Sequence, residues 1–151
     1  MKKLVDVYPY YYSDTERLFL IFRRSKSSLY AGQWRIIGGK CEKDENRSES
    51  ALRELTEETG IYPNKLWVIP SINQFYEPET DQIHHIPAFA AEMPFQQIVL
   101  NHEHDTFLWL PAQEAANKLL WPEQKRLLLL TDAILSSNSV LPEWDIRLHS
   151  E

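Results

Sequence analysis

Three glutamates, Glu54, Glu57 and Glu58, are spaced so that a helix brings their carboxylates to one face. Carboxylates clustered in this way repel one another unless a cation lies between them. Oxygen ligands favour hard cations, so we expect Mg²⁺, with Mn²⁺ as the alternative. Bound Mg²⁺ keeps waters, takes phosphate oxygens as further ligands and lowers the pKa of a bound water. The three residues therefore predict the attack of water on a pyrophosphate bond.

The residues around these glutamates make the pattern more specific. The run GGKCEKDENRSESALRELTEETGI reads G-x5-E-x7-R-E-U-x-E-E-x-G-U, in which U is a bulky apolar residue. The fixed letters are Gly39, Glu45, Arg53, Glu54, Glu57, Glu58 and Gly60, and Leu55 and Ile61 fill the apolar positions. Seven fixed letters occur by chance roughly once in 10⁸ start positions. An acidic run alone would indicate only the solvated face of an amphipathic helix, and the matching glycines, Glu45 and Arg53 argue against that alternative.

The pattern over residues 39–61 resembles the Nudix box, and the resemblance covers most of the chain. It implies an α/β fold, an α/β/α sandwich with a central mixed β-sheet, and hydrolysis of nucleoside diphosphates linked to another group. It also implies that the metal is bound by the glutamates Glu54, Glu57 and Glu58. The carbonyl of Gly39 is a further ligand, since a glycine lets the backbone approach a metal closely. Glu45 and Arg53 resemble the pair that fixes the loop and orients the carboxylates.

Segments after the box resemble a narrower subgroup, the dATP or dihydroneopterin triphosphate pyrophosphohydrolases. They are HEHDTFLWL, PAQEAANKLL and WPEQKRLLLL. The match puts Glu103 where many relatives have a loop glutamate that is an extra metal ligand or the general base. The flanking His102 and His104 are candidates for proton transfer or phosphate binding, with a surface or structural role as the alternative. The sequence leaves open whether Glu103 or a box glutamate deprotonates the water; the catalytic candidates are Glu54, Glu57, Glu58 and Glu103.

Four further residues are candidates for substrate binding. Strand alternation puts only one of Arg23 and Arg24 on the site face, and we favour Arg24 as the phosphate contact. Lys40 follows the Gly-Gly pair and is a second phosphate contact. Trp34 either stacks on a substrate ring or packs in the core. His85 is expected to line a nucleoside pocket, for which the neighbouring candidates are His84, Phe75 and Tyr76.

Length and composition limit the class of protein. The chain has 151 residues, and we expect one domain over residues 1–151. Its net charge of −6 argues against binding of a nucleic acid polymer, so the expected partner is a small phosphorylated molecule. A single cysteine, Cys41, is typical of a reducing compartment and predicts a cytoplasmic protein. No apolar run is long enough for a membrane span. The resemblance leaves the oligomeric state open between a monomer and a homodimer.

Hydrophobic patterns and turn residues predict the elements that must position these side chains. We expect strands at 4–12, 17–24, 34–37, 67–72, 83–93, 98–101 and 106–110, and helices at 47–59, 111–120 and 122–135. The box helix begins after Asn46 as N-cap and ends at Gly60. Pro9 predicts an edge position or a bulge in the first strand. Residues 73–82 are expected to form a loop, and the tail from Ser136 to be irregular.

The pattern leaves two functional alternatives. Because the box is shared among relatives with different substrates, a dinucleoside polyphosphate or a nucleotide sugar competes with a nucleoside triphosphate. A nucleotide-binding domain without turnover is the alternative from another class, since a fold does not fix a function.

Overall fold

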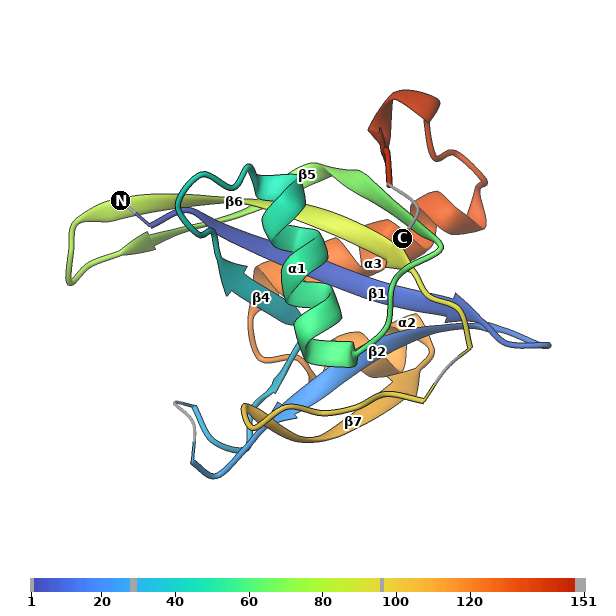
Figure 1. The fold of residues 1–151 in the computed structure, drawn as a ribbon, viewed down its shortest axis with the longest axis horizontal. Coiled ribbons are helices and arrows are strands. Elements are labelled where there is room, and N and C mark those ends of the chain that lie inside the picture. Colours follow the sequence, from blue (N-terminus) through green and yellow to red (C-terminus); the bar gives the residue numbers. More distant parts are fainter. Residues whose placement is uncertain (1, 28–29, 96, 149–151) are drawn as a thin grey trace.

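A mixed β-sheet of eight strands forms the centre of the protein, as described for residues 2–27, 30–95 and 97–148 of a computed structural model (Figure 1). The strand order is β3-β2-β1-β6-β5-β8, with β4 paired to β1 and β7 paired to β2. Strands β1 and β6 are parallel, whereas the other paired strands are antiparallel. The strands are β1 (Leu4–Tyr12), β2 (Arg17–Arg24), β3 (Trp34–Arg35), β4 (Ile37–Lys40), β5 (Lys65–Glu77), β6 (Gln82–Glu92), β7 (His104–Leu110) and β8 (Asp145–Ile146).

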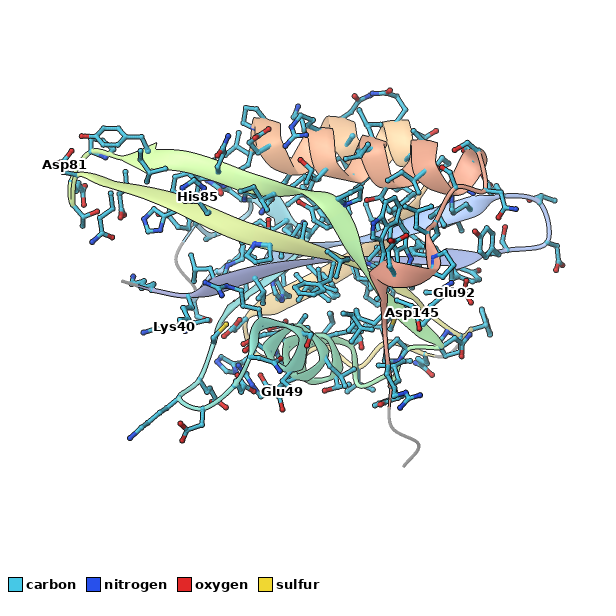
Figure 2. All side chains as sticks on the ribbon, turned by 90° about the horizontal axis from the view of Figure 1, so that it is seen from above. Lys40, Glu49, Asp81, His85, Glu92 and Asp145 are labelled. Carbon is cyan, nitrogen blue, oxygen red and sulfur yellow. The ribbon has the colours of Figure 1, made fainter. Side chains whose placement is uncertain are left out.

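Helices cover both faces of the sheet. Helix α1 (Arg47–Thr59) lies on one side, and α2 (Ala112–Lys118) and α3 (Pro122–Ser136) lie on the other (Figure 2). This arrangement confirms the predicted α/β/α sandwich around a mixed sheet. None of the helices in the described part of the chain is long and apolar enough to cross a membrane.

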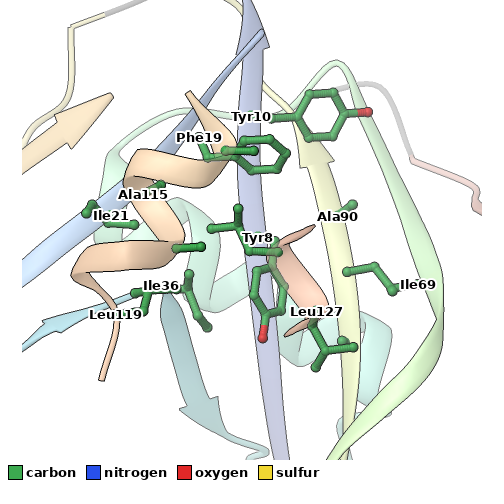
Figure 3. Packing of buried hydrophobic residues seen from close by; sticks show 14 of the residues in the cluster. Tyr8, Tyr10, Phe19, Ile21, Ile36, Ile69, Ala90, Ala115, Leu119 and Leu127 are labelled. Atoms are coloured by element: carbon green, nitrogen blue, oxygen red, sulfur yellow. The ribbon is translucent and has the colours of Figure 1, made fainter. Parts of the chain in front are cut away.

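Two apolar layers hold the helices to the sheet. On the side of α2 and α3, Tyr8, Tyr10 and Phe19 pack with Leu127 and other buried residues (Figure 3). The Trp67 indole donates a hydrogen bond to the Tyr10 hydroxyl at 2.9 Å, which satisfies two polar groups inside this layer. On the other side, the apolar stripe of α1 packs against alternate residues of β1 and β2. That second layer includes Ala51, Leu55, Val5, Val7, Leu20 and Phe22.

Strand β1 changes its partner on one side along its length. Residues Leu4–Val7 pair with β4, and Tyr10–Tyr12 pair with β2. Pro9 lies between the two ladders, so neither of them needs the N–H that proline lacks. The prediction of an edge position or a bulge at Pro9 was wrong, because β6 pairs along the other side of β1 with an unbroken register through Pro9 and Ala91.

The box helix begins and ends where the sequence predicts. The Asn46 side chain accepts a hydrogen bond from the Glu49 N–H, and the Glu49 carboxylate accepts one from the Asn46 N–H, each at 2.9 Å. At the other end Gly60 takes a left-handed conformation with φ of 71°, and its N–H donates to the Thr56 carbonyl. These caps fix the helix register and therefore the direction of its glutamates.

Removal of this N-cap gives a test of how much the capping box stabilises the site helix. Asn46→Ala is expected to lower the free energy of unfolding by about 1 kcal/mol, because the Glu49 N–H loses its acceptor. Asn46→Asp keeps an acceptor at the same place and should stay close to the wild type. Urea unfolding measures both, and equal stability of Asn46→Ala and the wild type would contradict a working cap.

The predicted loop at 73–82 is wrong, because β5 and β6 form one long hairpin there. Their pairing runs from Ile72 opposite Pro87 to Glu77 opposite Gln82, and only four residues turn the chain. The polar residues of this stretch suggested a loop, but cross-strand contacts such as the Phe75–His84 ring stack stabilise the ladder. The hairpin tip, at Asp81, extends beyond the body of the sheet (Figure 2).

Three shorter predictions also differ from the structure. Residues 98–101 form no strand: they lie beside the end of α1, where the Val99 N–H donates a hydrogen bond to the Thr59 carbonyl at 3.1 Å. The predicted strand at 34–37 is two short strands, β3 and β4, with Ile36 between them. The tail is not irregular throughout: after a 3-10 turn (Pro142–Trp144), β8 pairs with β5, and Trp144 stacks on Trp67. A two-residue strand beside an existing edge leaves no periodic pattern in the sequence.

Candidate active site

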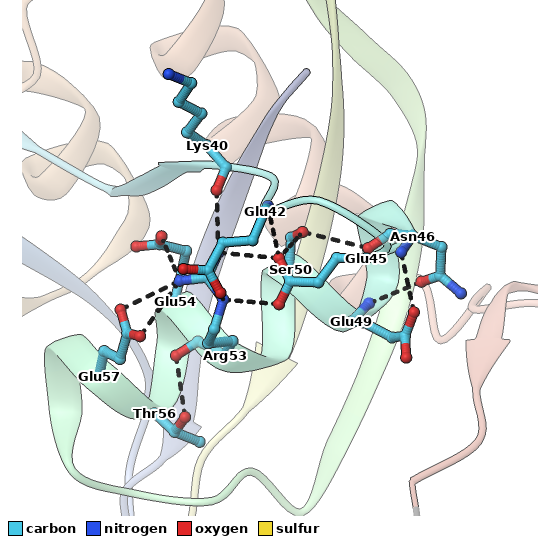
Figure 4. A network of polar contacts seen from close by, with 10 residues as sticks. All are labelled: Lys40, Glu42, Glu45, Asn46, Glu49, Ser50, Arg53, Glu54, Thr56 and Glu57. Atoms are coloured by element: carbon cyan, nitrogen blue, oxygen red, sulfur yellow. Dashed lines mark hydrogen bonds and ion pairs between the residues drawn. The ribbon is translucent and has the colours of Figure 1, made fainter. Parts of the chain in front are cut away.

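The guanidinium of Arg53 connects the loop after β4 to helix α1 (Figure 4). Its Nε donates to Glu45 at 2.7 Å, and Nη2 donates to the Lys40 carbonyl at 3.0 Å. Its Nη1 donates to Glu54 at 3.0 Å and to Glu57 at 3.2 Å. The hydrogen bonds from Arg53 lower the pKa of Glu45 to about 2. Arg53 therefore fixes the loop and holds two neighbouring carboxylates of the box side by side.

Gly39 makes the closest approach of the loop backbone to the helix carboxylates. A Cβ at this position would lie 2.2 Å from the Cδ of Glu54, so any side chain would displace that carboxylate. Burial, with a smaller effect from the charges of Glu57 and Glu58, raises the pKa of Glu54 to about 7 against the lowering effect of Arg53. A cation bound beside Glu54 would favour the charged form of this carboxylate.

Glu58 is held by a histidine from a distant strand. Its Oε2 lies 2.7 Å from Nδ1 of His104, the first residue of β7, and only 3% of Glu58 is exposed. Burial raises the pKa of Glu58, but the hydrogen bond and charge of His104 outweigh it, so the net shift is downward and Glu58 is a carboxylate. His104 was a candidate for proton transfer or phosphate binding because it flanks Glu103, and no signal in the sequence pointed to its contact with Glu58.

Glu103 lies in the segment between β6 and β7, directly before His104. Its carboxylate is 3.6 Å from the Arg24 guanidinium, and 43% of the side chain is exposed. Its carbonyl accepts a hydrogen bond from the Ser25 N–H, and its side chain contributes to lowering the pKa of Glu58. The structure thus places Glu103 next to the box glutamates, where a candidate ligand or base must lie.

A cleft of about 720 Å³ opens beside the box. Its lining includes Gly39, His104 and the two cationic candidates Arg24 and Lys40. Polar and aromatic side chains also line it, and they include Asp6, Arg35, Asn73, Phe75, Tyr76, Trp121 and Gln124. Phe75 and Tyr76 were predicted from the sequence, whereas Asp6, Arg35, Asn73 and Gln124 were not, because nothing local marks them as neighbours.

Two predicted substrate contacts do not line this cleft. Trp34 is half-buried against the core on the side of α2, with the Lys118 amine 5.6 Å from its ring centre. His85 is exposed on β6 opposite Gln74, and strand alternation turns the neighbouring His84 inward to Glu77. The core alternative for Trp34 is therefore the arrangement that the structure shows.

The donors of the site suit a hard divalent cation. Among residues 2–27, 30–95 and 97–148, no three His, Cys, Asp or Glu side chains are gathered closely enough to hold a metal ion. Arg53 and His104 hold the box carboxylates instead. Glu54, Glu57 and Glu58 offer oxygen donors alone, and the absence of a side chain at Gly39 leaves room for the Glu54 carboxylate beside the loop.

The protein is thus an α/β/α sandwich in which the glutamates of α1 lie next to a cleft of nucleotide size. Residues 4–130 match the sequence model of the NUDIX domain. The chain belongs to the NUDIX domain family, which confirms the resemblance of the box.

Solved structures of this family share the fold. A Listeria monocytogenes protein assigned to the NUDIX hydrolases is 22% identical, with 90% of this chain and 95% of that chain covered and a TM-score of 0.76. The Caenorhabditis elegans Ap4A hydrolase, in a binary complex, is 19% identical over 91% and 99% of the two chains, also with a TM-score of 0.76. The NUDIX domain of Shewanella oneidensis NrtR, complexed with ADP ribose, is 20% identical over 87% and 86%, with a TM-score of 0.73.

A curated relative shares part of its length with this chain. An octanoyltransferase from Myxococcus xanthus is 30% identical over 111 residues, which cover 68% of this chain. The match spans 29% of that relative, so most of the octanoyltransferase has no counterpart here.

Proposed function

We propose that this protein is a divalent-metal-dependent pyrophosphohydrolase of a nucleoside triphosphate or a related nucleoside-diphosphate-linked compound. The observation that carries the proposal is the arrangement of Glu54, Glu57 and Glu58, held by Arg53 and His104 beside a cleft that Gly39 and His104 help to line. Such a cleft accommodates a nucleotide-sized molecule.

In this proposal the metal is held by Glu54, Glu57 and Glu58, with the Gly39 carbonyl and Glu103 as further candidate ligands. Mg²⁺, or Mn²⁺ in its place, would polarise the phosphorus and lower the pKa of the attacking water. The cations Arg24 and Lys40, which line the cleft, bind phosphate oxygens. Arg53 and Glu45 hold the loop, and His104 holds Glu58 in its direction.

The reaction joins a water oxygen to phosphorus and breaks one bridging P–O bond. The water proton passes to a carboxylate, either Glu103 or a box glutamate. From a triphosphate, the products are a nucleoside monophosphate and pyrophosphate.

The subgroup resemblance favours a dATP-like substrate or dihydroneopterin triphosphate. Dinucleoside polyphosphates are an alternative substrate class, because one of the similar structures is an Ap4A hydrolase. Nucleotide sugars are another, because a second similar structure is complexed with ADP ribose. A binding domain without turnover is the remaining alternative.

A substrate panel with product analysis tests these candidates. Purified protein is assayed in Mg²⁺ and separately in Mn²⁺ with nucleoside triphosphates, dihydroneopterin triphosphate, dinucleoside polyphosphates and nucleotide sugars. Release of pyrophosphate from a triphosphate supports the proposal, whereas release of two nucleotides indicates a dinucleotide. Tight nucleotide binding in calorimetry with no hydrolysis of any compound would favour the binding domain.

Removal of divalent metal is expected to reduce hydrolysis to the background rate, since four carboxylates beside a phosphate chain leave its charge uncompensated. Addition of Mg²⁺ or Mn²⁺ in excess of the chelator should restore activity. Circular dichroism of the metal-free protein is expected to be unchanged, because the two apolar layers hold the fold. Full activity after exhaustive dialysis against chelator would contradict metal dependence.

The extent of the domain, the cellular location and the oligomeric state are further proposals. We propose one domain over residues 1–151, a cytoplasmic location suggested by the single cysteine, and a homodimer as the state to test by light scattering.

A further inference from the structure

The outer half of the β5–β6 hairpin, residues 72–77 and 82–87, forms one wall of the cleft. Its residues in the lining are Asn73, Phe75, Tyr76, Glu77 and Ile86. Beyond them the hairpin runs out to its tip near Asp81 (Figure 2). Because this half is a wall of the cleft, the direction in which it leaves the sheet sets how far its side chains lie from the box.

An irregularity in the ladder separates the outer half from the rest of the hairpin. The register shifts between Val68 and Ile72, so residues 69–71 of β5 lie opposite Ala88 of β6 alone. Pro70 lies in this stretch and lacks the N–H that a ladder needs. A bulge bends its strand and leaves main-chain groups without a ladder partner. The geometry of the bend therefore depends on the side chains that bind those groups.

Arg126, in the second turn of α3, binds the chain at this bulge. Its Nη2 donates hydrogen bonds to the Ser71 hydroxyl and to the Ile72 carbonyl, each at 3.1 Å. Its Nε donates to Glu123 at 2.6 Å, and this ion pair on the same helix directs the guanidinium toward β5. The Ile72 carbonyl is the first of the outer half, so Arg126 fixes the point from which the wall extends.

Two other contacts hold the same half through side chains farther along it. The Asn73 amide donates to the Asp6 carboxylate of β1 at 3.0 Å. The Phe75 ring centre lies 6.0 Å from that of Trp121, the residue before α3. Both contacts form only if the strand has already turned toward β1 and α3. Arg126 acts at the turn itself, on the main chain.

We propose that Arg126 is a positioning residue for substrate binding, which fixes the bend of β5 and thereby places the wall of the cleft opposite Gly39. Arg126 is outside the described lining of the cleft, so it acts through Ser71 and Ile72. The inference rests on the proposed function and goes beyond it, since it assigns substrate affinity to a residue that the substrate does not touch.

Arg126→Met tests the proposal, because methionine keeps the length and the apolar stem but has no donor. We expect KM for the compound that the panel shows to be hydrolysed fastest to rise about tenfold, the effect of losing a hydrogen bond from a charged group. The kcat value should stay within about twofold, because Arg53 and His104 still hold the box carboxylates. Arg126→Lys restores a charged donor without the planar fork and should recover part of the affinity.

Arg17→Met is the matched control. Arg17 binds the other end of α3, where its Nη2 lies 2.7 Å from the Asp132 carboxylate, and it is less exposed than Arg126. Its loss should lower the urea midpoint at least as much as Arg126→Met does, and KM should not change. An equal rise of KM in both variants would show a general effect of loosening α3 and would overturn the proposal. Wild-type KM in folded Arg126→Met would also overturn it.

Hydrogen exchange keeps the test independent of turnover. In Arg126→Met, amides of residues 72–77 and 82–87 are expected to exchange at least about tenfold faster than in the wild type, whereas those of 65–68 and 89–92 keep their rates. Protein that hydrolyses no compound would refute the proposed function, and the exchange difference would then decide the inference alone. Equal exchange of the outer half in variant and wild type would overturn the inference even in an active enzyme.

Discussion

Glu58→Gln is expected to lower kcat by about 10³-fold, the largest effect of any single change in this chain. The amide removes a charge from the proposed metal site, and the loss of a few kcal/mol of transition-state stabilisation corresponds to about this factor. The substitution keeps the size of the side chain and one oxygen for His104, so the fold should persist. Glu57 lies on the exposed side of the same cluster, and Glu57→Gln is also expected to lower kcat.

Steady-state kinetics and circular dichroism measure this prediction. Glu114→Gln, on the exposed face of α2, makes the same chemical change away from the cleft and should keep wild-type kcat. Wild-type turnover in both Glu57→Gln and Glu58→Gln would refute the assignment of the box as the catalytic site. Loss of the dichroism spectrum in Glu58→Gln would instead show that the Glu58–His104 pair is needed for folding.

Gly39→Ala is expected to reduce kcat by about 100-fold, since misplacement of a reacting group by about 1 Å costs this much. The new Cβ would lie 2.2 Å from Glu54 Cδ and 2.5 Å from its Oε1, so the Glu54 carboxylate must turn away. The atoms in conflict belong to the end of a flexible side chain rather than to the backbone. We therefore expect a much smaller effect on the free energy of unfolding than on turnover.

Gly38→Ala is the matched comparison. Its Cβ would have its nearest neighbour, Asp6 Oδ1, at an ordinary contact distance of 3.5 Å. We expect it to keep most of kcat, because the new Cβ would not displace a box carboxylate. Equal losses of kcat in the two variants would show that the loop backbone, and not the position of Glu54, limits turnover.

The sequence by itself determined the features that depend on neighbours a few residues apart. The bounds of α1 agree with the prediction because the Asn46–Glu49 capping box and Gly60 act within one helical turn. The glutamates and Arg53 share a helix, so their i, i+3 and i+4 spacing already places them together. The buried run Phe19–Phe22 likewise marks an internal strand through composition alone.

Only the tertiary structure decided which distant residues complete the site. His104 meets Glu58 across 46 residues, and Asn73 meets Asp6 across 67, with no periodic pattern connecting either pair. The same holds for Trp34, whose place in the core depends on α2, and for β8, whose two residues need the edge of β5. Local propensity is set by the backbone and its nearest side chains, whereas these contacts are set by how the layers pack. The carboxylate cluster of the box was therefore predictable from the sequence, whereas the cleft beside it forms only when residues from β1, β3, β5 and α3 come together.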